Sequence, residues 1–308
     1  GAGIVNRARR TFRWRAPGQH WLVVIPPYLW LLLFFAVPFA IVLKISLAES
    51  AIAQPPYTAL YEYMNNVLTL RVSLANYLFL LTDSLYFEAY LSSLRIAAIS
   101  TVICLLVGYP IAYGIARMQG PMQSLLLMLV VLPSWTSFLV RIYAWMGLLR
   151  NNGIINSVLL TLGVVDEPIR LLNTEVAVYI GIVYCYLPFL ILPLYANLAK
   201  LDNRLLEAAT DLGAGPIARF LRITLPLSRG GVIAGCMLVF IPVVGEFVIP
   251  ELLGGSETLM IGKVLWGEFF NNRDWPVASA VATVMLVVLL IPIMLFHRYQ
   301  FREMEAID

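Results

Sequence analysis

The chain has 308 residues, of which 60% are hydrophobic and 13% are charged, with a net charge of +3. About a quarter of the residues in a soluble domain are charged, so the composition excludes a pair of soluble globular units. The 12% aromatic content excludes a disordered chain, and only three cysteines exclude a disulfide scaffold. The mean hydropathy of +0.83 indicates a polytopic membrane protein.

Six apolar stretches are long enough to cross a bilayer core of about 30 Å, which takes about 20 helical residues. They predict spans at 21–47, 96–116, 122–149, 177–198, 232–253 and 277–296. Continuous apolar runs favour helices, because the strands of a membrane barrel would alternate apolar and polar residues. We therefore expect an all-α integral membrane protein with six transmembrane helices, within a membrane domain that covers residues 21–298.

Lys and Arg gather on one side of these spans, and cytoplasmic loops are typically rich in both residues. The segment 1–20 carries Arg7, Arg9, Arg10, Arg13 and Arg15. The loop 199–231 is also basic, and the tail 299–308 contains Arg302. We therefore predict that both termini and the loop 199–231 are cytoplasmic.

The loop between the first two spans runs from Ala48 to about Arg95 and is predicted to lie on the outer side. Its part from Leu74 to Tyr90 mixes aromatic and acidic residues, which is typical of a helix at the membrane surface. The outer loops together hold more acids than Lys and Arg. A mildly acidic outer face would attract a cation. An excess of acidic residues in outer loops also arises as a by-product of membrane topology, so both interpretations stay open.

The third and fourth spans contain aromatic residues in a polar setting. Trp135 lies mid-span in the stretch 134–137, which also contains two serines and a threonine. Tyr143, Tyr184 and Tyr186 follow in the same two spans. These four aromatic residues either line a path through the membrane or belong to the aromatic belts at its two surfaces.

The loop 199–231 is too long to be a simple connection, and loops of this length are usually functional. Its apolar residues recur at helical spacing and predict a short amphipathic helix that Asn203 caps; they are Leu205, Leu206, Ala209 and Leu212. Such a helix between two spans either docks in a groove of another protein or lies on lipid. Periodicity alone leaves both alternatives open.

Glu246 is the most unusual residue of the fifth span. It lies about 22 Å from the cytoplasmic start of the span at 1.5 Å per residue. A carboxylate at that depth costs a few kcal/mol and normally faces a cavity or a partner. It either lines or gates a path, pairs with Arg141 at similar depth in the third span, or reaches the lipid edge. Glu251, nearer the surface, is a further path candidate.

The sequence contains no motif for ATP hydrolysis or metal binding. A phosphate-binding loop has the pattern G-x-x-x-x-G-K-[ST], but near Gly262-Lys263 the first glycine is replaced by Glu257 and the hydroxyl by Val264. The cysteines form no metal-binding motif and are interpreted as small packing residues within spans; they are Cys104, Cys185 and Cys236. The chain is therefore not expected to be an enzyme, and any transport would draw energy from an ATPase partner or an ion gradient.

The loop 199–231 also contains a spaced motif, made of Glu207, Ala208, Ala209, Gly213, Ile223, Leu225 and Pro226. This motif resembles the EAA motif of ABC importer permeases. Further stretches are similar to the putrescine/spermidine branch of that family, and within it to the first permease subunit of putrescine importers; they lie at 110–113, 132–141, 151–153, 245–255 and 271–276. The resemblance covers nearly the whole chain without a departure from the family pattern.

The resemblance implies the type I importer permease fold, in which the loop forms a coupling helix that docks in a cleft of an ATPase subunit. It implies a bacterial inner-membrane location and three kinds of partner: a second permease, two copies of the ATPase that binds ATP and Mg, and a periplasmic polyamine-binding protein. The chain itself would hold no cofactor and no metal, and would have no nucleic-acid partner. It would form half of the polyamine path within the lipid bilayer.

A polyamine path needs carboxylates for the ammonium groups and aromatic faces for cation–π contacts. The candidates for the path or its gate are Glu246, Trp135, Glu251, Tyr143, Tyr184, Tyr186 and Arg141. One alternative is a permease for another small solute. Another is a gradient-driven carrier for an organic cation, which would predict inverted repeats; the two three-span halves show no clear pairing.

Overall fold

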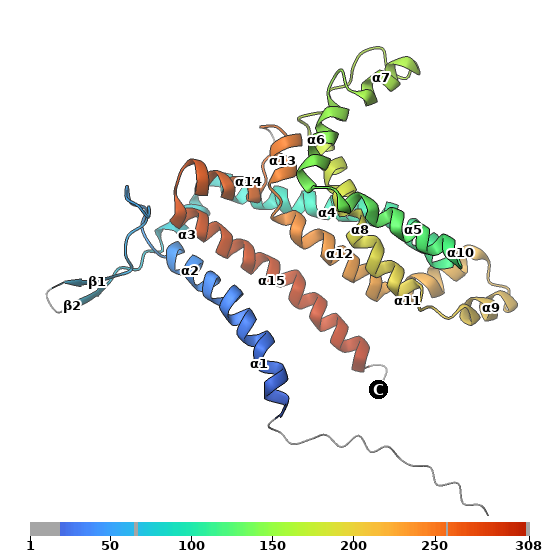
Figure 1. The fold of residues 1–308 in the computed structure, drawn as a ribbon, viewed down its shortest axis with the longest axis horizontal. Coiled ribbons are helices and arrows are strands. Elements are labelled where there is room, and N and C mark those ends of the chain that lie inside the picture. Colours follow the sequence, from blue (N-terminus) through green and yellow to red (C-terminus); the bar gives the residue numbers. More distant parts are fainter. Residues whose placement is uncertain (1–18, 65–66, 257, 306–308) are drawn as a thin grey trace, which may run out of the picture.

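The computed structural model describes residues 19–64, 67–256 and 258–305, and helices make up most of it (Figure 1). The arginines between Arg7 and Arg15, as well as Glu257, therefore lie outside the described residues. In the described ranges, four helices are long and apolar enough to cross a membrane, or up to six if each of two bent helix pairs forms one span. The prediction of an all-α protein with several spans is confirmed.

The first span consists of three consecutive helical segments, α1 (Gln19–Leu31), the π-helical turn η1 (Leu32–Ala36) and α2 (Val37–Ser46). The span lies beside the last helix, α15 (Trp275–Glu305), which α2 contacts (Figure 1). Only 6% of the apolar window Val23–Ser46 is buried. Its surface is therefore free to meet lipid or another membrane subunit.

The loop after the first span contains a short β-hairpin that the sequence did not predict. β1 (Tyr61–Met64) pairs antiparallel with β2 (Val67–Leu70). The buried amide of Asn76 then donates hydrogen bonds to the carbonyl oxygens of Ser46, at 2.9 Å, and Ala48, at 2.8 Å. These bonds attach the end of the loop to the end of α2.

The predicted surface helix at 74–90 is two elements in the structure. α3 (Ala75–Thr82) is a separate short helix, and α4 (Ser84–Arg117) begins directly after it and continues through the predicted second span. The carboxylate of Asp83 accepts a hydrogen bond from the Leu85 backbone N–H at 2.9 Å, which caps α4. The prediction of one surface helix was wrong because Asp83 is extended and breaks it.

The third span is not the continuous helix predicted at 122–149. α5 (Pro121–Val131) ends in the 3₁₀ turn η2 (Leu132–Trp135), and α6 (Phe138–Leu149) and α7 (Ile154–Thr161) continue after an 89° bend. The backbone at Thr136 is extended, and that of Ser137 is also non-helical, with a φ of −54° and a ψ of 136°. The prediction was wrong because hydropathy does not register a change of direction within an apolar segment.

The fourth span, α8 (Glu175–Leu198), agrees with its predicted range. Four short helical segments follow it: α9 (Asn203–Asp211), α10 (Pro216–Arg219), the π-helical turn η3 (Phe220–Thr224) and α11 (Leu225–Leu227). The chain then bends by 65° into α12. The loop 199–231 is therefore helical, as its periodicity predicts.

The fifth span ends earlier than predicted. α12 (Arg229–Val244) stops before Gly245, and a separate short helix, α13 (Val248–Leu253), follows the non-helical residues 245–247. α14 (Ile261–Trp266) and η4 (Gly267–Asn271) lead from there to α15. The prediction of one helix over 232–253 was wrong because the chain turns at this break, which is named the 245–247 break below.

The core of the protein lies where α4, α8 and α12 pack against one another. Small residues permit this close approach: a Cβ atom on Gly108 would lie 2.8 Å from the Leu190 side chain, and one on Gly235 would lie 2.9 Å from the Leu190 carbonyl oxygen. Cys104 and Cys185 are buried in the same core as free thiols. Packing of small residues is the usual means of association between membrane helices.

Candidate functional site

The α9 helix is amphipathic and projects at one end of the molecule (Figure 1). Leu206 is buried, whereas Leu205 is exposed and Leu212 is 89% exposed. The cap of the helix is Asp202, whose carboxylate accepts a hydrogen bond from the Arg204 backbone N–H at 2.9 Å. The prediction that Asn203 is the cap was therefore wrong by one residue, because the helix already begins at Asn203.

The first half of the EAA-type motif lies on the accessible side of α9. Glu207 and Ala208 are exposed, and Ala209 is half-buried. Gly213 ends the helix with a φ of +82°, in the left-handed region that favours glycine. A Cβ atom at Gly213 would meet no described atom within 4 Å. The motif glycine therefore faces open space, where the surface of another protein could approach.

The second half of the motif lies on the returning arm of the loop. Ile223 and Pro226 are half-buried and Leu225 is partly exposed, just before the bend into α12. The two arms and the end of α4 enclose a pocket of about 350 Å³, lined by Tyr113, Arg117, Asn203, Leu206, Glu207, Thr210, Pro216, Arg219, Phe220 and Thr224. Only Glu207 of the predicted coupling residues lines this pocket.

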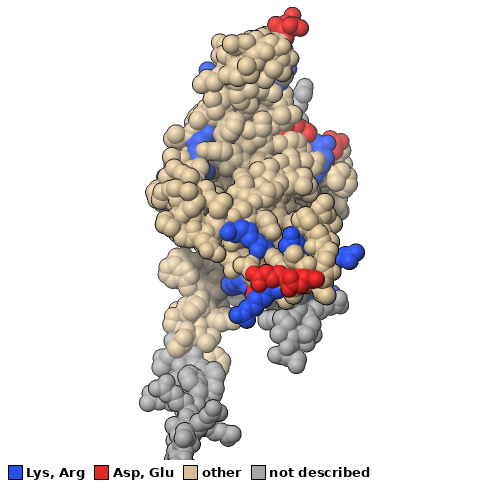
Figure 2. Space-filling model, turned by 90° about the vertical axis from the view of Figure 1, so that its right-hand side faces the viewer, with Lys and Arg blue, Asp and Glu red and all other residues tan. Residues whose placement is uncertain are grey.

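Charged side chains surround the same end of the molecule. Figure 2 looks onto the side that carries α9 and α10 and shows Lys and Arg side chains around a short band of Asp and Glu side chains. Arg204 and Arg219 are among the basic residues of these two helices, and Glu207 and Asp211 are the acids of α9. The surface thus combines exposed leucines with a charged rim, which is a common composition for a protein interface.

Glu246 lies in the 245–247 break and is only 8% exposed. Its Oε1 accepts hydrogen bonds from the backbone N–H groups of Val248, at 3.0 Å, and Ile249, at 3.4 Å. Its Oε2 accepts a 2.5 Å hydrogen bond from the Tyr186 hydroxyl. The carboxylate therefore caps α13 and joins it to α8, so the structure brings together two of the predicted path residues.

Arg141 does not form the anticipated ion pair with Glu246 in the described structure. Its guanidinium lies 5.7 Å from the centre of the Phe138 ring. Its Nε and one terminal nitrogen are buried, and no described residue accepts a hydrogen bond from them. Buried N–H groups without an acceptor are costly, so these two nitrogens are well placed to gain an acceptor in another conformation or from another subunit.

The remaining aromatic candidates occupy different environments. Trp135 is 71% exposed and Tyr143 is 57% exposed, on either side of the bend between η2 and α6. Tyr184 instead packs edge-to-face against Trp145, with ring centroids 5.4 Å apart. The bend therefore presents two large aromatic rings outward, where lipid, a second subunit or a solute can meet them.

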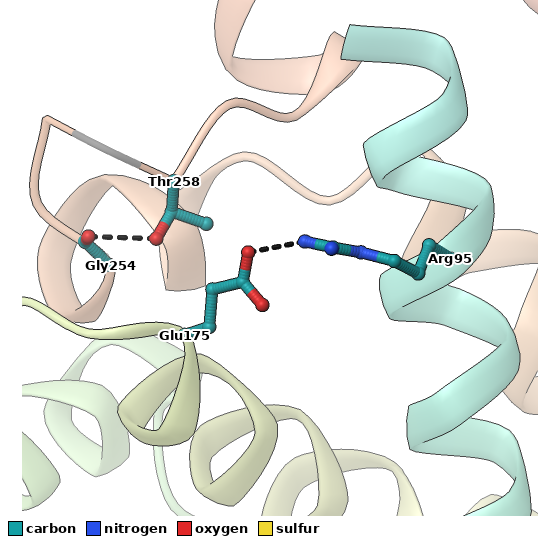
Figure 3. Close-up of polar contacts among 4 residues, drawn as sticks. All are labelled: Arg95, Glu175, Gly254 and Thr258. Atoms are coloured by element: carbon teal, nitrogen blue, oxygen red, sulfur yellow. Dashed lines mark hydrogen bonds and ion pairs between the residues drawn. The ribbon is translucent and has the colours of Figure 1, made fainter. Parts of the chain in front are cut away.

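Glu251 is on α13 and forms an ion pair with Lys263 of α14, at 3.1 Å. Two further contacts close by were not predicted from the sequence, and Figure 3 shows them together. Glu175, in the first turn of α8, pairs with Arg95 of α4. Beside it, the Thr258 hydroxyl donates a hydrogen bond to the Gly254 carbonyl oxygen at 2.8 Å.

A row of aromatic rings, also not predicted, starts at the 245–247 break. Phe247 stacks on Trp266 with ring centroids 4.4 Å apart, and Trp266 contacts Phe270 at 4.1 Å. Phe269 continues the row to Trp275 at the start of α15, at 5.0 Å and almost parallel. Trp266 and Phe270 are four residues apart in consecutive helical segments, so the sequence could have indicated their contact. The contacts of Phe247 and Trp275 join separate elements, so no sequence period could indicate them.

The described residues contain no group of three or more His, Cys, Asp or Glu side chains that could hold a metal ion. An exposed helical motif lies at one end, and a carboxylate-capped break with aromatic neighbours lies toward the other.

Comparison with known proteins places nearly the whole chain in one family. The family described as binding-protein-dependent transport system inner membrane component matches residues 20–305. The chain is 43% identical over 269 residues to the spermidine/putrescine transport system permease protein PotB of Haemophilus influenzae, which covers 87% of this chain and 90% of that protein. It is 45% identical over 226 residues to the Escherichia coli protein of the same name, with 73% and 82% covered.

A solved structure shows the same fold. It is a bacterial alginate ABC transporter in complex with a periplasmic protein that binds an alginate pentasaccharide. One of its chains is 16% identical, with a TM-score of 0.68, and the match covers 92% of this chain and 94% of that chain. The fold, the family match over residues 20–305 and the two relatives agree: this chain belongs to the inner-membrane permease components of binding-protein-dependent ABC transport systems.

Proposed function

We propose that the chain is one of two permease subunits of an ATP-driven importer for polyamines, in a bacterial inner membrane with both termini in the cytoplasm. Coupling to the ATPase is supported by the exposure of α9 and of its motif residues. Glu207 and Ala208 are accessible, and Gly213 borders open space. The polyamine class is supported by relatives that are more than 40% identical and named for spermidine and putrescine transport.

The partners follow from the surfaces that the chain leaves uncovered. The exposed apolar face of α9 suits a cleft in an ATPase subunit, and two such subunits would bind the ATP and Mg. A second permease would cover part of the first span and the outward-facing rings of Trp135 and Tyr143. A periplasmic binding protein would deliver the polyamine at the opposite end.

The polyamine path uses carboxylates and aromatic faces. Trp135 and Tyr143 are accessible and offer cation–π contacts, each worth about 0.5–2 kcal/mol. Glu246 becomes available to an ammonium group when its hydrogen bond from Tyr186 opens. Glu251, Tyr184 and Arg141 complete the proposed path and gate. Weak contacts are required here, because a tightly held solute would not be released.

In the transport cycle, ATP binding closes the ATPase pair and moves the docked coupling helices. The membrane domain then changes between two conformations, and each ligand shifts their populations by its differential affinity. In this scheme the permease supplies the path and the mechanical connection, while hydrolysis occurs in the partner.

The test is reconstitution of the two permeases, the ATPase and the binding protein in proteoliposomes. ATP hydrolysis and uptake are measured with putrescine, spermidine and an amino acid. We expect both polyamines, and not the amino acid, to stimulate hydrolysis and to accumulate. Stimulation by the amino acid alone would refute the polyamine assignment, and uptake driven by an ion gradient without ATP would refute the ATP-driven mechanism.

A further inference from the structure

One face of α4 meets the coupling loop at residues that lie outside the EAA-type motif. Tyr109, Tyr113 and Arg117 are spaced four residues apart, so they lie on the same side of the helix at its C-terminal end. This face, named the α4 seat below, contacts both arms of the loop. The spacing was visible in the sequence, but nothing in the sequence indicated what the face meets.

The first contact holds the start of the coupling helix. A terminal nitrogen of Arg117 donates a 2.6 Å hydrogen bond to the side-chain oxygen of Asn203, the first residue of α9. The same guanidinium lies 5.0 Å from the centre of the Tyr113 ring, which restricts its orientation. At the other end of α9, Arg219 donates to the Thr210 hydroxyl at 2.7 Å. Both ends of the coupling helix are therefore held.

The second contact holds the returning arm. Phe220 places its ring edge-to-face against Tyr109, at 5.5 Å, and against Tyr113, at 6.1 Å. The Tyr109 hydroxyl also forms a buried 2.8 Å hydrogen bond with the hydroxyl of Ser228, directly before α12. The α4 seat thus joins the motif helix and the start of the fifth span to one helix.

The pocket of about 350 Å³ lies among these contacts. Because this space separates parts of α9 from the seat, the connection depends on a few side chains instead of a continuous packed surface. Arg117 and Asn203 both line the pocket and bridge it by their hydrogen bond. Removal of a single one of these groups should therefore weaken the connection measurably.

The same helix reaches the 245–247 break. Ser93 of α4 accepts a 2.8 Å hydrogen bond from the backbone N–H of Ile261. The next residue, Gly262, packs so closely on the break that a Cβ atom would lie 2.7 Å from the carbonyl oxygen of Glu246. A displacement of α9 can therefore reach the neighbourhood of Glu246 through one continuous helix, without passing along the intervening loops.

We propose that the α4 seat transmits the movement of the coupling helix to the membrane domain, and that Arg117 is a positioning residue for ATP-coupled transport although it lies outside the EAA-type motif. This inference rests on the proposed docking of α9 to an ATPase. It differs from that docking because Arg117 acts on the membrane side of the coupling helix. Loss of Arg117 should therefore spare assembly and hydrolysis but reduce the transport obtained from each ATP.

The experiment uses the complete reconstituted importer with its binding protein and measures uptake per ATP hydrolysed, together with co-purification of the subunits. For Arg117→Gln we expect an intact complex that hydrolyses ATP and a roughly fivefold lower ratio of uptake to hydrolysis. Asn203→Leu should behave alike, and Asn203→Asp should retain coupling because its carboxylate still accepts from Arg117. Arg150→Gln, a change at an exposed arginine remote from α9, is the charge-matched control.

The double variant Arg117→Gln with Asn203→Leu should be no worse than either single variant, since both remove the same hydrogen bond. An unchanged ratio in Arg117→Gln, or additive losses in the double variant, would overturn the proposal. Should Arg117→Gln fail to assemble, the Asn203→Leu and Asn203→Asp pair makes the same comparison. Gly213→Glu separates the two proposals. Normal uptake by Gly213→Glu would refute the docking of α9 to the ATPase. Loss of uptake by Gly213→Glu, together with a normal ratio of uptake to hydrolysis in Arg117→Gln, would refute only the role of the α4 seat.

Discussion

Gly213 offers a test in which a backbone effect and a docking effect can be separated. Its φ of +82° means that a residue with a Cβ atom is strained there by about 1–2 kcal/mol. The surrounding space is open among the described residues, so no clash within the chain adds to this cost. Gly213→Glu additionally brings a charge into the docking surface, where desolvation costs several kcal/mol more. We expect this variant to reach the membrane at normal levels but to lose more than about 90% of polyamine uptake.

Two substitutions at the same position isolate the backbone part. Asn adopts the left-handed region more readily than most residues with a Cβ atom, so Gly213→Asn should keep uptake within about twofold of the wild type. Uptake by Gly213→Ala should lie between that of the Asn variant and that of the Glu variant. The assay is initial-rate uptake in proteoliposomes, normalised to the permease present and compared with binding-protein-stimulated ATP hydrolysis. Normal transport by Gly213→Glu would refute the docking argument. Equal losses of uptake in all three variants would show that only the backbone conformation of the turn matters.

Three further predictions concern the path and the 245–247 break. Glu246→Gln keeps an oxygen for the Val248 and Ile249 N–H groups, so the variant should fold. The KM for uptake should rise by roughly tenfold, because the charge that binds an ammonium group is lost. An unchanged KM would show that Glu246 only caps α13. Gly262→Ala should lower the thermal unfolding temperature of the purified protein, because overpacking against the break costs about 1–3 kcal/mol. Trp135→Ala should leave membrane levels normal, since the ring is exposed, and reduce uptake severalfold; uptake equal to that of the wild type would remove Trp135 from the path.

Much of the architecture follows from the chain alone, because a bilayer imposes a fixed length on any helix that crosses it. The fourth span, predicted at 177–198, is α8 at Glu175–Leu198. The periodicity of Leu205, Leu206 and Leu212 likewise indicates the α9 region, since an amphipathic helix needs one apolar face. The spacing of Glu207 and Gly213 along the chain is enough to mark both residues as parts of one motif.

The turns inside spans and the pairing of distant segments were decided only by the tertiary structure. Hydropathy averages over a window, so it could not show that the chain bends at Thr136 or stops being helical before Glu246. Once the helix breaks, its freed N–H groups need acceptors in a medium without water. Some of those acceptors are local, as when Glu246 accepts from Val248 and Ile249. Others come from distant positions, as when Ser93 accepts from Ile261, 168 residues away. The sequence therefore determined which segments enter the membrane, and packing decided which of their polar groups meet.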